Sequence, residues 1–169
     1  MQGLDCLKTL CFYNCWMNEK IYSICQNIPD TIRKEDKGAF FKSIHGTLNH
    51  ILLADRIWLG RFKNQLFKVT SLDQELYSEF VTLWQERQKT DQEIEHWINS
   101  LTEFQLTQPF RYHSIVRKQD HTYLLGHLVL HFFNHQTHHR GQVTTLIKQM
   151  GYEPGVTDLL WLPGAEIKE

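Results

Sequence analysis

The chain has 169 residues, of which 41% are hydrophobic and 22% are charged, an ordinary balance for a soluble globular protein with one core. Its net charge is −1 with the histidines neutral, which excludes the basic surface expected of a nucleic-acid or membrane-surface binder. No apolar run approaches the length of a bilayer span, and no basic flank followed by an apolar segment opens the chain. We therefore expect a single cytoplasmic domain over residues 1–169, with no nucleic-acid partner and no membrane partner.

The cysteines are crowded at one end of the chain. All four lie in the first 25 residues, at Cys6, Cys11, Cys15 and Cys25. A disulfide framework spreads its cysteines over the elements that it joins, so this crowding favours a reducing compartment. Cys11 and Cys15 lie one helical turn apart. We interpret them as small buried side chains, with a metal-ligand pair as the alternative.

Two long helices are predicted in the first part of the chain. Apolar residues recur at helical spacing over residues 4–27, and the polar segment 27–38, which contains proline and glycine, is predicted to be a loop. A second helix is expected from about residue 39 to 67, and Asp55 lies within its apolar stripe, where a charge needs a partner. The stripe consists of Phe40, Phe41, Ile44, Leu48, Ile51, Trp58 and Phe62.

A third amphipathic helix is predicted from about residue 72 to 101. Arg87 and Asp91 stand four residues apart near its apolar face, which favours a salt bridge. Glu93 and His96 form one Glu-x-x-His unit. A carboxylate-bridged di-iron bundle needs two such units facing inward, and this one falls on the polar side, so we reject a di-iron site.

The pattern changes after Pro109. Residues 110–116 and 121–124 read as two short strands around a turn, and a last helix follows from about Tyr123 to Met150, with Thr122 as its N-cap candidate. The tail DLLWL is expected to fold back on the helices. Four long amphipathic segments in a chain of this size predict an all-α fold, a four-helix bundle with a small β-hairpin before the last helix.

The last helix carries five histidines, His127, His131, His135, His138 and His139. On a helical wheel, His139 falls near the middle of the apolar stripe and His135 about 40° away on its shoulder. The other three turn toward the polar face. Two imidazoles one turn apart on a core-facing surface are close enough to bind a single metal ion. The alternative is a pair of core histidines that hydrogen-bond to polar neighbours such as Gln136 or Gln142.

A metal site needs a third ligand from a neighbouring helix, and the second helix offers two. His45 and His50 lie off opposite shoulders of its apolar stripe, so either one can turn inward in a bundle. Periodicity does not choose between them.

Three strings in the sequence resemble the DinB family, within the DinB/YfiT-like metalloenzyme superfamily. They are NHQTHHRGQV (134–143), SIHGTLNHILLADRIWLGRF (43–62) and FYNCWMNEKIY (12–22). The likeness spans nearly the whole chain, and the H-x-x-x-H followed directly by Arg-Gly-Gln is its most specific part. The resemblance implies a divalent metal held by His50, His135 and His139, with His131 and His138 as neighbours of the site.

Three neutral imidazoles and an open position are typical of a catalytic rather than a structural metal site. Such an ion keeps its full charge and lowers the pKa of bound water toward ~7, or that of a thiol. We expect Zn or Ni as the cofactor, with Fe, Cu or Mn compatible with the same ligands. Members of the superfamily include transferases that use low-molecular-weight thiols.

Three functional hypotheses follow. The first is a metal-dependent enzyme acting on a small molecule, a thiol-dependent transferase or a hydrolase that uses metal-bound water. The second is a non-catalytic metal-binding protein of a stress response or an interaction. The third is a helical bundle with a vestigial site. Relatives of this family commonly pair, and Trp16 and Trp97 toward polar faces are candidates for a homodimer contact. The catalytic residues, the substrate and the role of His45 are not readable from the sequence.

Overall fold

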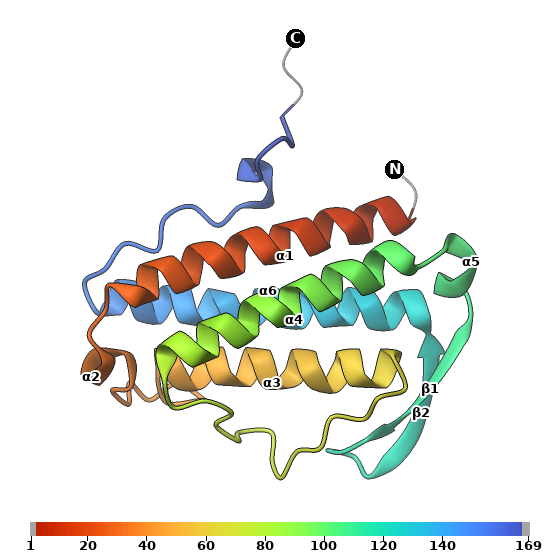
Figure 1. The fold of residues 1–169 in the computed structure, drawn as a ribbon, viewed down its shortest axis with the longest axis horizontal. Coiled ribbons are helices and arrows are strands. Elements are labelled where there is room, and N and C mark those ends of the chain that lie inside the picture. The colour runs from red at the N-terminus through yellow and green to blue at the C-terminus, as the bar shows by residue number, and fades with distance from the viewer. Residues whose placement is uncertain (1–2, 167–169) are drawn as a thin grey trace.

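The computed structural model describes residues 3–166, and its frame is a bundle of four long helices (Figure 1). These are α1 (Gly3–Gln26), α3 (Ile44–Phe62), α4 (Phe80–Ser100) and α6 (Leu125–Gln149). Helix α1 packs against α4 and α6, and α3 packs against the same two helices. The cyclic order around the bundle is therefore α1, α4, α3, α6, so α3 and α6 lie side by side.

Shorter elements close the ends of the bundle. Helices α2 (Asp30–Arg33) and α5 (Glu103–Leu106) are single turns, and η1 (Leu159–Trp161) is a 3-10 turn in the tail. Strands β1 (Pro109–Ser114) and β2 (Gln119–Leu124) form an antiparallel hairpin directly before α6. Figure 1 shows this hairpin near the C-terminal end of α3. The predicted fold, a helical bundle with a small hairpin before the last helix, is confirmed.

The second predicted helix is shorter than expected. It begins only at Ile44, because the Ser43 side chain caps it by accepting a hydrogen bond from the backbone N–H of Gly46. Residues 38–43 form a tight turn instead, with Lys42 at a φ of 66°. The helix ends at Phe62, followed by Asn64 in the left-handed region. Residues 63–79 contain no helix or strand, so the next helix starts at Phe80 and not near residue 72.

The last helix begins two residues later than predicted. Thr122 does not cap it, since Thr122 pairs with Arg111 in the hairpin and strand β2 continues to Leu124, which stands at the N-cap position. The tail after α6 returns to the bundle as expected, because the Tyr13 hydroxyl donates to the backbone carbonyl of Thr157 and Leu162 is buried in the core.

The middle of the bundle is polar. One apolar cluster lies toward the α2 end and another toward the hairpin, and between them is a layer of buried polar side chains from all four long helices. Arg87 on α4 pairs with Asp55 and, at 2.8 Å, with Asp91. Asp55, whose charge in an apolar stripe was expected to need a partner, therefore has one. The polar layer consists of Asn14, Asn18, Asp55, Arg87, Asp91, Gln136 and Arg140.

The cysteines do not form disulfides in the structure. Cys11 and Cys25 are buried, Cys15 is half-buried and Cys6 is exposed. Within residues 3–166, none of the helices is both long enough and apolar enough to cross a bilayer.

Candidate metal centre

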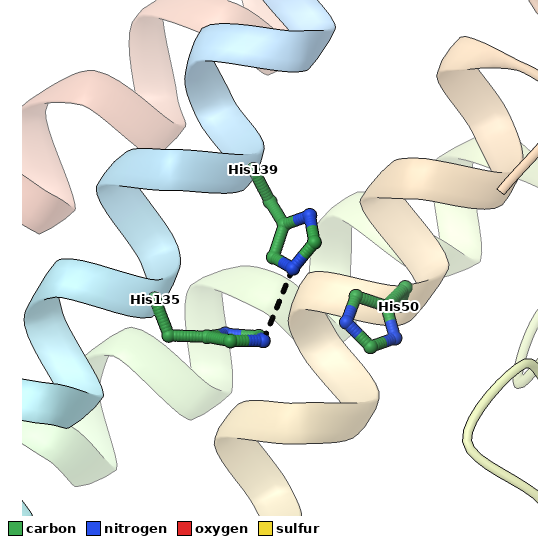
Figure 2. A group of neighbouring side chains, drawn as sticks. All are labelled: His50, His135 and His139. Atoms are coloured by element: carbon green, nitrogen blue, oxygen red, sulfur yellow. Dashed lines mark hydrogen bonds between the residues drawn. The ribbon is translucent and has the colours of Figure 1, made fainter. Parts of the chain in front are cut away.

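Three histidines meet between α3 and α6 at the level of the polar layer. His50 projects from α3, and His135 and His139 project from successive turns of α6 (Figure 2). One nitrogen from each ring lies within 4.8 Å of the other two. The ring centres are 4.4 to 5.3 Å apart. The structure therefore brings together the three residues that were expected to share a site.

His45, the other candidate on α3, turns away from this group. Its Nε2 lies 2.9 Å from the backbone carbonyl oxygen of Tyr77, in the loop between α3 and α4. Asn49 fixes the same stretch of loop, because its Oδ1 accepts hydrogen bonds from the backbone N–H groups of Leu76 and Tyr77. His45 thus helps to hold the loop and lies outside the group of three histidines.

The loop also fixes the ring of His50. Its Nδ1 lies 2.9 Å from the backbone carbonyl oxygen of Leu72. A carbonyl oxygen only accepts, so Nδ1 carries the hydrogen and the lone pair of the neutral ring is on Nε2. A hydrogen bond of this kind from the second ring nitrogen is common for histidines that bind metals, since it sets both tautomer and orientation.

Gln142 does the same for His139. Its Oε1 lies 2.8 Å from Nδ1 of His139, and its Nε2 lies 3.4 Å from Nε2 of His138. With Nδ1 donating to Gln142, the lone pair of His139 is also on Nε2. This nitrogen is 3.1 Å from Nε2 of His135, the contact drawn in Figure 2. His135 therefore donates from Nε2 here, and its proton must move to Nδ1 or leave before the ring can bind a metal.

All three rings are neutral at physiological pH. Burial and, to a smaller extent, the neighbouring histidines lower the pKa of His50 to about 4 and that of His135 to about 3, and the hydrogen bond of His50 to Leu72 only partly opposes this. Burial also lowers the pKa of His139, against the opposing effect of its hydrogen bond to Gln142. Imidazole binds a metal only when it is deprotonated, so these environments favour the binding form.

Phe41 covers one side of the group. Its ring is stacked on that of His50, with the centres 3.7 Å apart, and meets His139 edge-on at 5.5 Å. Phe41 was expected in the stripe of a helix, but it lies on the turn before α3. Gly46 permits this close approach, because a Cβ atom there would overlap the backbone carbonyl oxygen of Phe41. Phe41 also lines a cavity of about 310 Å³ that extends toward His45.

His131 and His138 are neighbours of the site, as expected. The ring of His131 is 6.2 Å from that of His135 and packs against Trp58, and His138 contacts Gln142. Among residues 3–166, the three central histidines are the one group of His, Cys, Asp or Glu side chains close enough to hold an ion together. A ligand set of three neutral imidazoles is compatible with a divalent metal.

Sequence reasoning missed the groups that orient the ligands. The carbonyl of Leu72 has no signature in a sequence, since any residue supplies one. Gln142 had a usable signal, because it follows His139 by three residues and therefore shares its helix face.

Comparison with known proteins identifies the family of this chain. A sequence model of the DinB family matches residues 3–169. Protein DinB of Bacillus subtilis (strain 168) is 29% identical over 159 residues, covering 86% of this chain and 87% of that protein. Because the family match spans almost the whole chain, the protein belongs to the DinB family.

Proposed function

We propose that the protein is one domain that binds a divalent transition metal through Nε2 of His50, His135 and His139 and uses it in catalysis. The observation that carries this proposal is the convergence of the three rings, two of which have Nδ1 hydrogen-bonded to an acceptor and the lone pair on Nε2. The DinB family membership supports it. Zn or Ni fits the imidazole set best, and Fe, Cu or Mn is compatible with it.

The reaction class is a transferase that acts through a small thiol, or a hydrolase that acts through water. An ion with three neutral ligands supplies a Lewis acid that lowers the pKa of a water or thiol in the open position. The chain supplies the surroundings. Phe41 excludes water from the side of His50, and the hydrogen bonds to Leu72 and Gln142 hold two rings in place.

Metal titration tests the binding half of the proposal. Untagged protein stripped of metal is titrated with Zn or Ni in competition with a chromophoric chelator. We expect about one equivalent to bind, and His50→Ala, His135→Ala and His139→Ala each to weaken binding by more than about 100-fold. The matched control is His138→Ala, an exposed histidine beside the site, which should bind almost as the wild type does. Wild-type binding in His50→Ala would contradict the ligand assignment.

Turnover tests the catalytic half. Metal-loaded and metal-stripped protein are compared with a panel of small thiols and electrophiles, and with small esters and amides for hydrolysis. We expect an activity that requires the metal and is lost in the three ligand variants. A fully metal-loaded protein without turnover on either panel would favour the non-catalytic metal-binding alternative.

We also propose that the chain pairs as a homodimer in the cytoplasm. The tryptophans that suggested pairing are occupied within the chain, since Trp97 stacks on Phe62 at 4.5 Å and Trp16 packs against Tyr13. The surface that supports pairing is instead on the tail after α6. The tail exposes Leu160 at 85% and Trp161 at 63%, and such large apolar side chains are candidates for burial against a second copy. Sedimentation of the wild type and of Trp161→Ser tests this surface.

A further inference from the structure

A second cavity lies beside α6, on the side that faces α1 and not α3. It has a volume of about 390 Å³ and is bordered by α1, α6 and the tail, which runs along α1 there (Figure 1). Its lining includes none of the three central histidines, which meet between α6 and α3. Cavities of this size hold small molecules. The cavity is therefore a candidate binding site separate from the metal centre.

Arg140 of α6 lies in the wall of this cavity and is only 3% exposed. Its Cζ lies 5.4 Å from the ring centre of Tyr13, which lines the same cavity. Nη1 donates to Oδ1 of Asn14 and, at 3.5 Å, to Oδ1 of Asn18, and Nη2 donates to Oγ1 of Thr137 at 3.3 Å. The guanidinium group is thereby fixed in place between α1 and α6.

One edge of this guanidinium group has donors to spare. Nε of Arg140 is buried without a hydrogen-bond partner, and Nη2 beside it contacts Thr137. Within residues 3–166, no carboxylate forms an ion pair with Arg140, and the two aspartates of the polar layer, Asp55 and Asp91, pair with Arg87. A buried cation without a counter-ion is costly, and the edge formed by Nε and Nη2 matches the two oxygens of a carboxylate.

The rest of the lining restricts what such a ligand looks like. Leu10, Met17 and Leu159 supply apolar surface. Gly141 adds no side chain, and a Cβ atom there would meet no heavy atom within 4 Å. Asp158 on the tail is exposed and gives the lining a negative charge, which repels a second anionic group. The cavity therefore suits one carboxylate and an apolar body.

We propose that this cavity binds a small monocarboxylate with an apolar body, whose two carboxylate oxygens accept hydrogen bonds from Nε and Nη2 of Arg140. The body of the ligand packs against the apolar side chains of α1 and of the tail. Asp158 excludes dicarboxylates and phosphate monoesters. The site goes beyond the proposed function, because it uses none of the metal ligands and does not depend on a bound metal.

The test measures binding at Arg140 directly. Full-length, zinc-loaded protein carrying ¹⁵N-labelled arginine is titrated with phenylpropionate and with phenylpropionamide, which has the same ring and length but no charge. We expect the acid to shift the Nε–H resonance of Arg140 and to bind at least about tenfold more tightly than the amide, because its hydrogen bonds are charge-assisted. Phenylsuccinate, which adds a second carboxylate, should bind at least about tenfold more weakly than phenylpropionate.

Two neighbouring threonines provide a matched pair of variants. Both hydroxyl groups donate to the backbone carbonyl of Gly141, but Thr144 lines the cavity and Thr145 is exposed outside it. Thr144→Phe should fill the cavity and weaken binding of the acid by at least about tenfold, whereas Thr145→Phe should bind as the wild type does. Arg140→Lys should retain only part of the preference for the acid, because lysine cannot form the bidentate contact. Thermal unfolding shows which variants are folded.

A carboxylate also binds metal ions, so the acid is titrated into His135→Ala as well. We expect the affinity of the wild type there, and its loss would show that the acid binds the metal and would overturn this inference. Equal affinity for acid and amide, or an unchanged Arg140 resonance, would refute the role of Arg140. Wild-type affinity in Thr144→Phe would refute the choice of cavity. Phenylsuccinate that binds as tightly as phenylpropionate would refute the restriction to one carboxylate.

Discussion

The contact between Gln142 and His139 gives the sharpest prediction about the site. Gln142 is half-buried, and its Oε1 lies 2.8 Å from Nδ1 of His139. Gln142→Leu keeps the size of the side chain and removes the acceptor, so the ring of His139 loses the partner that fixes its tautomer. Loss of such a partner typically weakens metal binding by about 10- to 100-fold, or about 1.4 to 2.7 kcal/mol.

The opposite change should act in the opposite direction. In Gln142→Glu a carboxylate replaces the amide oxygen and accepts a stronger, charge-assisted hydrogen bond from Nδ1. We expect this variant to bind metal more tightly than the wild type. The two substitutions together test both the sign and the size of the change in metal affinity. A general disturbance of the helix would weaken metal binding in both variants.

Competition with a chromophoric chelator, with Zn and separately with Ni, measures both effects. The matched control is Gln149→Leu, the same substitution at an exposed position on the same helix, which should leave the affinity unchanged. Both leucine variants should keep the unfolding free energy of the metal-free protein within about 0.5 kcal/mol of the wild type. Wild-type metal affinity in Gln142→Leu would show that Gln142 does not orient His139.

Three further predictions concern the surroundings of the site. Gly46→Ala forces the turn that carries Phe41 away from α3, so we expect about 1–3 kcal/mol lower stability in urea and weaker metal binding; unchanged values for both would contradict the contact. Asp55→Leu leaves the buried Arg87 without one of its carboxylates, so we expect a loss of about 3–5 kcal/mol, checked by denaturation at pH 7. In metal-free protein, the pKa of His135 is lowered to about 3 in the folded state, so below about pH 6.5 the unfolded chain binds a proton that the folded chain does not. Its unfolding free energy should therefore fall with acidification from pH 6.5 toward 3, by up to about 1.4 kcal/mol per unit, and His135→Gln should flatten this slope in denaturation curves.

The helices were predicted well where one apolar face decides the structure. The first helix was expected over residues 4–27 and spans Gly3–Gln26. The start of the second helix was predicted wrongly. Phe40 and Phe41 have helical spacing, yet they lie on the turn before the helix, and Phe40 is 85% exposed there. Spacing alone cannot distinguish a helix from a turn that places two rings at suitable positions. Ser43, a good N-cap residue, was the local signal for the true start.

The site was predictable in part. His135 and His139 follow from the helical wheel, because both ligands lie on one element and their relation is local. The choice of His50 over His45 came from the family resemblance, and neither burial nor periodicity would have made it, since both side chains are buried. The two rings differ in their surroundings in the structure. The loop supplies carbonyl acceptors at residues 72 and 77, and only the ring held at residue 72 also faces α6.

The polar layer in the middle of the bundle explains how the two helices of the site keep their spacing. Gln136 donates to Oδ1 of Asp55 at 2.8 Å, a hydrogen bond from α6 to α3 between fully buried side chains. Gln136 adjoins His135, and Asp55 lies five residues after His50. A buried hydrogen bond to a charged group contributes about 1.5–3 kcal/mol and requires a specific geometry. Helix register at the site is therefore set by the folded core, so the rings converge through packing of the chain itself, which reduces the reorganisation that metal binding requires.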